Sequence, residues 1–287
     1  MSAWIETHRS MVKAWECDSF GHFTVAYYFD RFADASATMR EALAERRGLD
    51  PAAWMPVDYT ARFAAELRGG EVLHVESGII AAGADHLRIG HRLLNSASGK
   101  LCTSVEELLR LRPGSSPLGD AGRALADPAV EWETAKEDPG FADEARDGFI
   151  PTGRDRVKPW EVDESGALAL PNYVHRSSVG CIQLLTAMGQ PPEWLRANHR
   201  GFSTFEIRLR LDGPGPGSGD ALRLESGLMQ LGSSSVRMLH RLHDARSGHR
   251  LATVRQSGVH FDLEARKSTP IPAELRGKAA ELLLRKP

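Results

Sequence analysis

The chain has 287 residues, with 36 basic and 38 acidic side chains and a formal net charge of −2. This balance leaves no broad basic field, so we expect neither nucleic acid nor a membrane surface as a partner. No apolar run approaches the ~20 residues of a membrane span, and the first ten residues lack the apolar core of a signal peptide. The three cysteines, Cys17, Cys102 and Cys181, have no metal-type spacing. An odd number of cysteines fits a reducing compartment. We therefore expect a soluble cytoplasmic protein.

The sequence contains a long internal repeat. Residues 12–18 (VKAWECD) and 157–163 (VKPWEVD) share five of seven identities, at a spacing of 145 residues. Later segments match at a spacing of 149: VESGII at 75–80 with LESGLM at 224–229, and HRL at 91–93 with HRL at 240–242. The glycine-rich segment at 213–219 is the expected place of the four extra residues. Two copies of domain length predict two tandem units.

The first copy is predicted to have one strand, one helix and then four strands. A strand over Ser10–Glu16 is followed by a turn at Asp18–Gly21. Apolar residues at helical spacing then predict an amphipathic helix from Tyr27 to about Arg47. Segments of strand character complete the copy: Tyr59–Leu67, Val72–Ala82, His86–Asn95 and Leu101–Leu111.

The second copy repeats this order. It has a strand over Val157–Glu161, a turn at Asp163–Gly166 and a helix over Tyr173–Met188. Its four later strands are Phe202–Leu211, Ala221–Leu231, Ser235–His243 and Leu251–Phe261. We divide the chain into a first unit at 1–112, a linker at 113–152 with local helix over Glu131–Lys136, a second unit at 153–264 and a helical tail at 265–287.

This order of elements predicts the α+β class. Hairpin-length connections imply antiparallel pairing, and the one long helix of each copy must cover the apolar face of the sheet. We expect two such units, each an antiparallel sheet wrapped around its helix. They are expected to pair as a pseudo-dimer, with pockets at the seam between the copies.

A short motif in each copy resembles a known family. Asp18-Ser-Phe-Gly21-His22 through Tyr28, and Asp163-Glu-Ser-Gly166 through Pro171-Asn172-Tyr173, are similar to the hotdog-fold thioesterases of the 4-hydroxybenzoyl-CoA thioesterase type. The resemblance implies two tandem hotdog units and hydrolysis of an acyl thioester. Many relatives carry Asn or His where this chain has Thr24 and Val25, and His22 is replaced by Ala167 in the second copy.

Hydrolysis of a thioester needs a base or nucleophile and donors for the developing oxyanion. Asp18 is the candidate base or nucleophile, with Asp163 as its counterpart, and His22 orients Asp18 or moves a proton. Backbone N–H groups at the start of each helix supply the oxyanion donors. By resemblance these lie at about Val25 and Leu170. The remaining substrate-binding candidates are Gly21, Tyr28, Gly166, Asn172 and Tyr173.

Each candidate also has a purely structural interpretation. Asp-x-x-Gly is an ordinary turn sequence, His22 could cap that turn, and both tyrosines could fill the core. Glu16 and Glu161 would share a strand face with the neighbouring Asp, or form surface salt bridges. Cys17 would face away from Asp18, and the second copy has Val162 in its place.

The expected partner is an acyl-CoA or an acyl carrier protein thioester, with no cofactor and no metal. Whether two such pseudo-dimers associate into a homodimer stays open. The basic residues expected near the nucleotide end of coenzyme A are Arg88, Arg92, Lys100, Arg237, Arg241 and Arg250. Two other functions remain: a hydratase or dehydratase of the same fold acting on enoyl thioesters through Asp18 and His22, or a non-catalytic acyl-CoA-binding protein.

Overall fold

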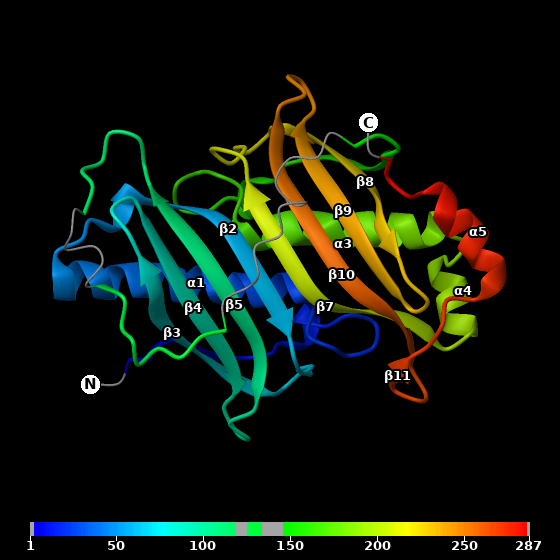
Figure 1. The fold of residues 1–287 in the computed structure, drawn as a ribbon, viewed down its shortest axis with the longest axis horizontal. Coiled ribbons are helices and arrows are strands. Elements are labelled where there is room, and N and C mark those ends of the chain that lie inside the picture. The colour runs from blue at the N-terminus through cyan, green and yellow to red at the C-terminus, as the bar shows by residue number, and fades with distance from the viewer. Residues whose placement is uncertain (1–2, 119–124, 134–145, 286–287) are drawn as a thin grey trace. The chain divides into compact units, whose positions relative to one another are not determined.

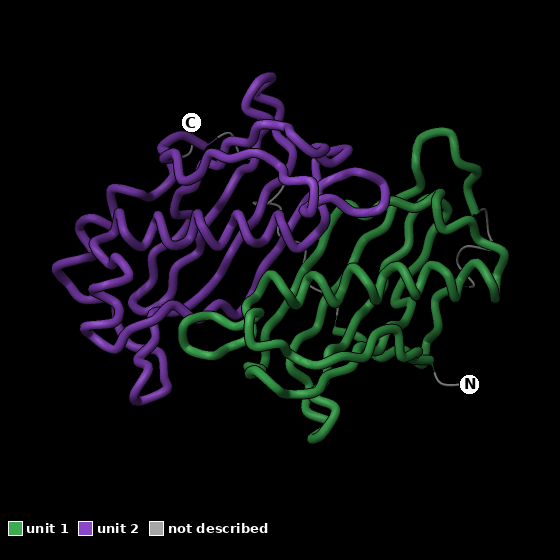
Figure 2. The backbone as a smooth tube through the Cα atoms, turned by 180° about the vertical axis from the view of Figure 1, so that it is seen from behind, with its two compact units in different colours: residues 1–136 green, residues 137–287 purple. Residues whose placement is uncertain are grey.

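The computed structural model of the chain describes residues 3–118, 125–133 and 146–285. The chain divides into two compact units, Met1–Lys136 and Glu137–Pro287, which are shown in separate colours in Figure 2. The boundary falls inside the segment predicted as a linker. Among the described residues, no helix has both the length and the apolar character needed to cross a membrane.

Unit 1 is an antiparallel sheet with one long helix against it (Figure 1). The strands pair in the order β1-β3-β4-β5-β2, so the first strand lies beside the third and the second beside the fifth. The elements are β1 (Ile5–Met11), the 3-10 turn η1 (Ala14–Glu16), α1 (Val25–Arg47), η2 (Pro51–Ala53), β2 (Trp54–Phe63), β3 (Val72–Ala82), β4 (His86–Asn95) and β5 (Leu101–Leu111).

Unit 2 repeats the arrangement, with strands paired in the order β7-β10-β9-β8-β6. Its elements are β6 (Ile150–Arg156), η4 (Pro159–Glu161), α3 (Leu170–Ala187), α4 (Pro192–Ala197), β7 (Arg200–Leu211), β8 (Ala221–Leu231), β9 (Ser235–Asp244), β10 (Arg250–Asp262), β11 (Lys267–Ser268) and α5 (Ala273–Glu281). Two tandem α+β units of this kind confirm the predicted fold class.

The apolar spacing explains how α1 lies on its sheet. Phe29, Phe32 and Ala35 are fully buried, and Met39 continues the same face one turn later. The helix ends at Gly48, whose φ of 67° is the left-handed conformation that terminates many helices. The helix therefore runs from the turn that follows β1 across the width of the sheet.

The strands predicted at Ser10–Glu16 and Val157–Glu161 are wrong. The first strand of each unit ends earlier, at Met11 and Arg156, and the following residues form a 3-10 turn. In unit 1 the Glu16 carboxylate accepts the backbone N–H of Lys13 at 2.9 Å, which closes that turn. Because the residues are not extended, the alternation of strand faces does not apply to Glu16 and Asp18.

Smaller differences concern where elements begin and where the copies diverge. Each helix begins before its predicted tyrosine, and α4 is an element that the sequence analysis missed. Tyr59 of β2 and Ile207 of β7 occupy equivalent positions in the two sheets, opposite Glu107 and Gln256. They are 148 residues apart, so the spacing has increased from 145 before this point in the chain. Most of the four extra residues therefore precede β7, not the glycine-rich segment. Residues 131–133 are not helical, and the rest of that predicted helix lies outside the described residues.

A buried chain of hydrogen bonds runs through the core of unit 1. Thr7 Oγ1 lies 2.7 Å from Ser77 Oγ, which lies 2.7 Å from His91 Nδ1. His91 Nε2 lies 3.2 Å from the carboxylate of Glu107, and both side chains are fully buried. Glu107 also accepts hydrogen bonds from the Ser36 hydroxyl of α1 at 2.9 Å and from the Tyr59 hydroxyl at 2.8 Å. This network ties the central helix to the middle of the sheet.

Burial alone would raise the pKa of Glu107. The hydrogen bond and charge of His91, with the hydroxyls of Ser36 and Tyr59, outweigh that effect and hold the pKa below its usual value. Glu107 is therefore a buried carboxylate.

Unit 2 has the same threonine–serine–histidine hydrogen bonds, but the carboxylate end of the network is different. Thr152 Oγ1 lies 2.6 Å from Ser226 Oγ, which lies 2.7 Å from His240 Nδ1. The position of Glu107 is taken by Gln256, whose Nε2 donates to Thr204 at 2.8 Å. Within the described residues, His240 Nε2 has no partner. Burial lowers the pKa of His240 to about 3, so this histidine is neutral.

Candidate active site

The turn after η1 contains Asp18, seven residues before the first residue of α1. Asp18 Oδ1 accepts the backbone N–H groups of Phe20 and His22 at 2.9 and 3.0 Å. Gly21 donates its N–H to the Asp18 carbonyl at 3.0 Å and has a φ of 77°, which favours glycine. The Asp18 side chain is 42% exposed. The turn thus fixes Oδ1 of a partly exposed carboxylate by backbone N–H groups.

The chain returns on itself so that the helix begins beside this turn. Cys17 and Phe23 form a β-bridge, and the Thr24 N–H donates to the Glu16 carbonyl at 2.9 Å. The first N–H groups of a helix have no intrahelical acceptor and carry the positive end of its dipole. Among the described residues, none provides an acceptor for the N–H groups of Val25 and Ala26. Asp18 therefore lies in a closed loop, and these donors follow directly after the point where the loop closes.

A buried ion pair anchors that loop to the helix. Both carboxylate oxygens of Glu16 lie 2.7 Å from Nη2 of Arg31, and both side chains are almost fully buried. Arg31 also lies over the ring of Phe23, at 5.6 Å from its centroid. Glu16 therefore does not pair with Asp18. It forms a salt bridge, as in the alternative interpretation, but the pair is buried and not at the surface.

Unit 2 forms the same turn with different side chains. Asp163 Oδ1 accepts the N–H and hydroxyl of Ser165 at 2.8 and 2.6 Å, and Gly166 has a φ of 80°. Pro171 occupies the second helical position and has no N–H to offer, so Leu170 provides the donor there. The side chain of Asn172 donates to the Glu161 carbonyl at 2.8 Å, which makes it part of the loop closure.

The ion pair of unit 2 is more open. Arg176 Nη2 lies 3.0 Å from both Glu161 and Asp155. Burial would raise the pKa of Glu161, but the hydrogen bond and charge of Arg176 lower it overall. Glu161 thus has the same anchoring role as Glu16, at a site nearer to solvent.

His22 lies among charged side chains. Its Nδ1 is 3.9 Å from Asp18 Oδ2, and its Nε2 is 3.4 Å from Glu66 and 3.3 Å from Arg68 Nη2. A β-bridge joins His22 to Arg68. The histidine therefore connects the Asp18 turn with the segment between β2 and β3. Unit 2 has Ala167 in its place, bridged to Gly217 of the glycine-rich segment.

The two predicted tyrosines are core residues. Tyr28 and Tyr173 are 3% and 4% exposed. Burial raises the pKa of Tyr173 to about 12 and that of Tyr28 still further. Neither phenol is an acid or base near neutral pH, and each packs at the start of its helix.

Several basic residues expected near coenzyme A are held by carboxylates. The ion pairs are Arg88–Glu106, Arg92–Glu76 at 2.6 Å and Arg250–Asp212 at 2.7 Å. Arg92 also lies 3.8 Å from the ring centroid of Trp4. Their charges are therefore largely balanced within the sheet.

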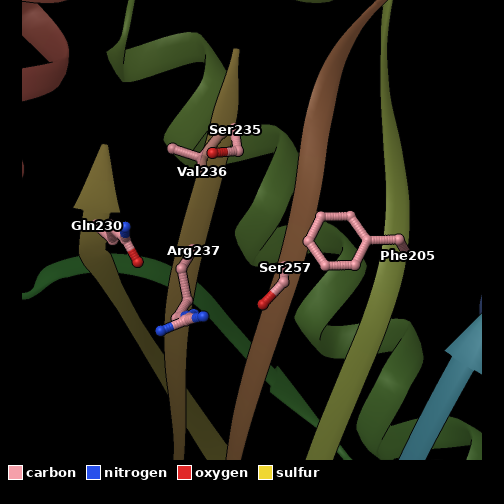
Figure 3. A pocket seen from close by; sticks show the side chains of 6 residues that line it. All are labelled: Phe205, Gln230, Ser235, Val236, Arg237 and Ser257. Atoms are coloured by element: carbon pink, nitrogen blue, oxygen red, sulfur yellow. The ribbon is translucent and has the colours of Figure 1, made fainter. Parts of the chain in front are cut away.

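A small pocket lies away from these turns, on unit 2. Figure 3 shows its lining by Phe205, Gln230, Ser235, Val236, Arg237 and Ser257. Its volume is about 40 Å³, which suits a few water molecules and not an acyl chain. Of the residues singled out in the sequence, Arg237, expected near coenzyme A, lines this pocket, whereas the predicted catalytic residues do not.

Comparison with solved structures supports the fold. Residues spanning 89% of this chain superpose on 96% of an oleoyl thioesterase (putative) from Lactobacillus plantarum, with a TM-score of 0.67 and 12% identity. An acyl-ACP thioesterase from Bacteroides thetaiotaomicron gives a TM-score of 0.65 over 90% of this chain and 98% of that chain, at 10% identity. At such identities the likeness concerns the fold alone.

Sequence comparison identifies the family. The L-carnitine dehydrogenase/betainyl-CoA thioesterase of Rhizobium meliloti (strain 1021) is 31% identical over 117 residues, which is 41% of this chain and 23% of that protein. The match thus spans about a quarter of the relative's length. The family model of the thioesterase-like superfamily matches residues 12–112 and 157–279, one segment in each unit. The chain therefore belongs to the thioesterase-like superfamily.

Proposed function

We propose that this protein hydrolyses acyl thioesters at the Asp18 turn of unit 1. Membership of the thioesterase-like superfamily supports this reaction class. The observation that carries the assignment is a partly exposed carboxylate, fixed by backbone N–H groups in a closed loop that leads directly into the unpaired donors of α1. Base and oxyanion donors are the two groups that the reaction requires.

In the proposed reaction, Asp18 Oδ2 takes a proton from water as the water oxygen bonds to the thioester carbonyl carbon. The negative charge that develops on the carbonyl oxygen is stabilised by the N–H groups of Val25 and Ala26. Collapse of this intermediate breaks the C–S bond, and the thiolate leaves. A thiolate is a good leaving group, so no strong acid is needed beside it. Direct attack by Oδ2 would instead give a mixed anhydride, which water then cleaves.

Oxygen labelling separates these two routes. In a single turnover in ¹⁸O-enriched water, the general-base route leaves Asp18 unlabelled and places the label in the acid product. Direct attack places ¹⁸O in Asp18 when water attacks the aspartyl carbon of the anhydride. Mass spectrometry of the peptide that contains Asp18 provides the measurement.

Two observations rank unit 1 above unit 2. Unit 1 offers two helix N–H donors, whereas Pro171 removes one of them in unit 2. Asp18 Oδ2 lies near His22, whereas unit 2 has Ala167 there. Asp163 is proposed as a second, weaker site.

The substrate proposed first is an acyl-CoA, in line with the coenzyme A thioester named for the Rhizobium relative. An acyl carrier protein thioester is the second substrate, since the Bacteroides structure is described as an acyl-ACP thioesterase.

The test is thiol release from a panel of short, long, branched and aromatic acyl-CoAs and acyl-ACPs, with an enoyl-CoA included. We expect wild type to release thiol from at least one substrate, and Asp18→Asn/Asp163→Asn to release none while keeping the wild-type circular dichroism spectrum. Undiminished release by the double variant would overturn the mechanism. Hydration of the enoyl-CoA without thiol release would identify a lyase, and binding without turnover an acyl-CoA-binding protein.

A further inference from the structure

The segments VKAWECD and VKPWEVD share five identities, and the structure accounts for three of them. Val12 is fully buried, Glu16 forms the ion pair with the helix, and Asp18 forms the turn. Their counterparts in unit 2 occupy equivalent places. The two remaining identities are the lysine and the tryptophan, and the fold does not require either side chain.

Both tryptophans are among the most exposed large apolar side chains of the described residues. Trp15 is 74% exposed and Trp160 is 79% exposed. An indole ring is normally largely buried, since exposure of so much apolar surface to water is unfavourable. The residue before it differs between the copies, Ala14 against Pro159, yet the tryptophan is the same. Such a ring is suited to contact with a ligand.

Lys13 is the second unexplained identity. Its Nζ lies 5.5 Å from the centroid of the Trp15 ring. Among the described residues, neither Lys13 nor Lys158 forms an ion pair with a carboxylate. Lys158 interacts electrostatically with Glu161, but neither ammonium group is held within salt-bridge distance of a carboxylate, unlike the paired arginines of the sheet.

The pair lies beside the proposed active site. Trp15 is in η1, three residues before Asp18, so at most about 11 Å of extended chain separates them. Lys13 lies two residues further back. Both residues therefore belong to the short segment that leads into the Asp18 turn.

We propose that Trp15 and Lys13 bind the phosphopantetheine arm of the thioester substrate. This arm extends from the reacting sulfur through two amides to a phosphate. The indole face packs on the uncharged amide portion, and Lys13 pairs with the phosphate. The arm is common to coenzyme A and acyl carrier protein, so both carriers present the same chemistry. Trp160 and Lys158 form the matching surface in unit 2. This inference rests on the proposed function, because it takes the acyl thioester as substrate.

The test compares substrates that differ in this arm. Acyl-CoA, acyl-phosphopantetheine and acyl-ACP contain it, whereas an acyl-N-acetylcysteamine thioester lacks the pantoyl portion and the phosphate. For Trp15→Ala and for Lys13→Ala, we expect kcat/KM to fall about tenfold more on the first three substrates than on the truncated one, mainly through KM. Equal losses on acyl-CoA and acyl-phosphopantetheine would show that the nucleotide adds nothing, whereas a loss confined to acyl-CoA would overturn the proposal in favour of a nucleotide site.

Two controls keep the test decisive. Val179→Ala removes an exposed apolar side chain elsewhere, on α3 of unit 2, and should leave all rates unchanged. Calorimetric binding of desulfo-CoA, which cannot form a thioester, reports on the arm without turnover. If wild type binds desulfo-CoA and Trp15→Ala binds it about tenfold more weakly, the inference stands even where no substrate is hydrolysed. Equal binding by Trp15→Ala, Trp160→Ala and wild type would overturn it.

Discussion

Unit 1 and unit 2 follow one plan but differ in the ionisable groups of their cores. Each has the same threonine, serine and histidine in a buried chain of hydrogen bonds. In unit 1 the histidine meets the Glu107 carboxylate, whereas in unit 2 that position is Gln256. The groups around it change as well: Ser36 and Tyr59 of unit 1 correspond to Cys181 and Ile207.

The difference shows that a buried charge requires hydrogen-bond donors around it. A carboxylate in the core is tolerated where several donors surround it, and Glu107 has three. Where the serine and tyrosine hydroxyls are absent, the residue is the neutral glutamine and the histidine is neutral too. One backbone thus accommodates a buried carboxylate or a neutral amide at this position, provided that its neighbours change together.

The largest expected effect comes from removing the buried Glu107 carboxylate. Glu107→Ala leaves buried His91 without its partner and should lower the free energy of unfolding by about 3–5 kcal/mol. Gln256→Ala is the matched variant in unit 2 and should cost about 1–3 kcal/mol, since it removes a neutral group. Urea denaturation measures both. Equal losses would contradict the assignment of Glu107 as a buried carboxylate.

The pH dependence of stability should differ between the units. The folded-state pKa of His240, about 3, lies below its ordinary 6.5, so the unfolded chain takes up a proton first as the pH falls. Unit 2 should therefore lose stability below about pH 6.5, by about 1.4 kcal/mol per pH unit. The pKa of Glu107 is lowered from 4.5, so its contribution is complete above that pH and is lost only in stronger acid.

Hydrogen exchange at decreasing pH, followed by mass spectrometry, reports on each unit separately. Peptides of β8 and β9 should lose protection at a higher pH than those of β3 and β4. His240→Gln should remove this early loss. Simultaneous loss in both units, unchanged by that substitution, would show that His240 does not control it.

The smallest expected effect concerns the Asp18 turn. His22→Ala removes the imidazole near Asp18 Oδ2 and should lower kcat/KM for the best thioester about tenfold, or about 1.4 kcal/mol. The matched control is His86→Ala, an exposed histidine beside Asp85, which should leave the rate unchanged. If both variants behave alike, His22 has only a structural role.

The repeated segments of the sequence predicted much of the fold. Apolar periodicity located α1, α3 and most strands to within a few residues, because those elements bury one face. The first strand of each unit was not located correctly. One reason is that β1 is an edge strand with many polar residues. The other is that the following turn, η1, depends on a side chain that folds back to the backbone. The spacing of apolar residues in the sequence does not indicate a contact between a side chain and the backbone.

The Glu16–Arg31 pair and the Glu107 network could not be read from local patterns. Their partners are 15 and 16 residues or more apart and meet only in the folded core. A signal was nevertheless present: Ser77 and His91 both belong to segments that recur in the second copy. Identity between copies at polar positions indicated a buried role there. At Lys13 and Trp15, the same identity coincides with exposure instead.

The most direct test of the account is the rate of thiol release by Asp18→Asn and by Asp163→Asn, each measured alone on the best thioester. The account predicts a loss of at least about a hundredfold for Asp18→Asn, in the range expected for removal of a general base, and a much smaller loss for Asp163→Asn. An Asp18→Asn protein that is folded and fully active, even with Asp163 also replaced, would contradict it.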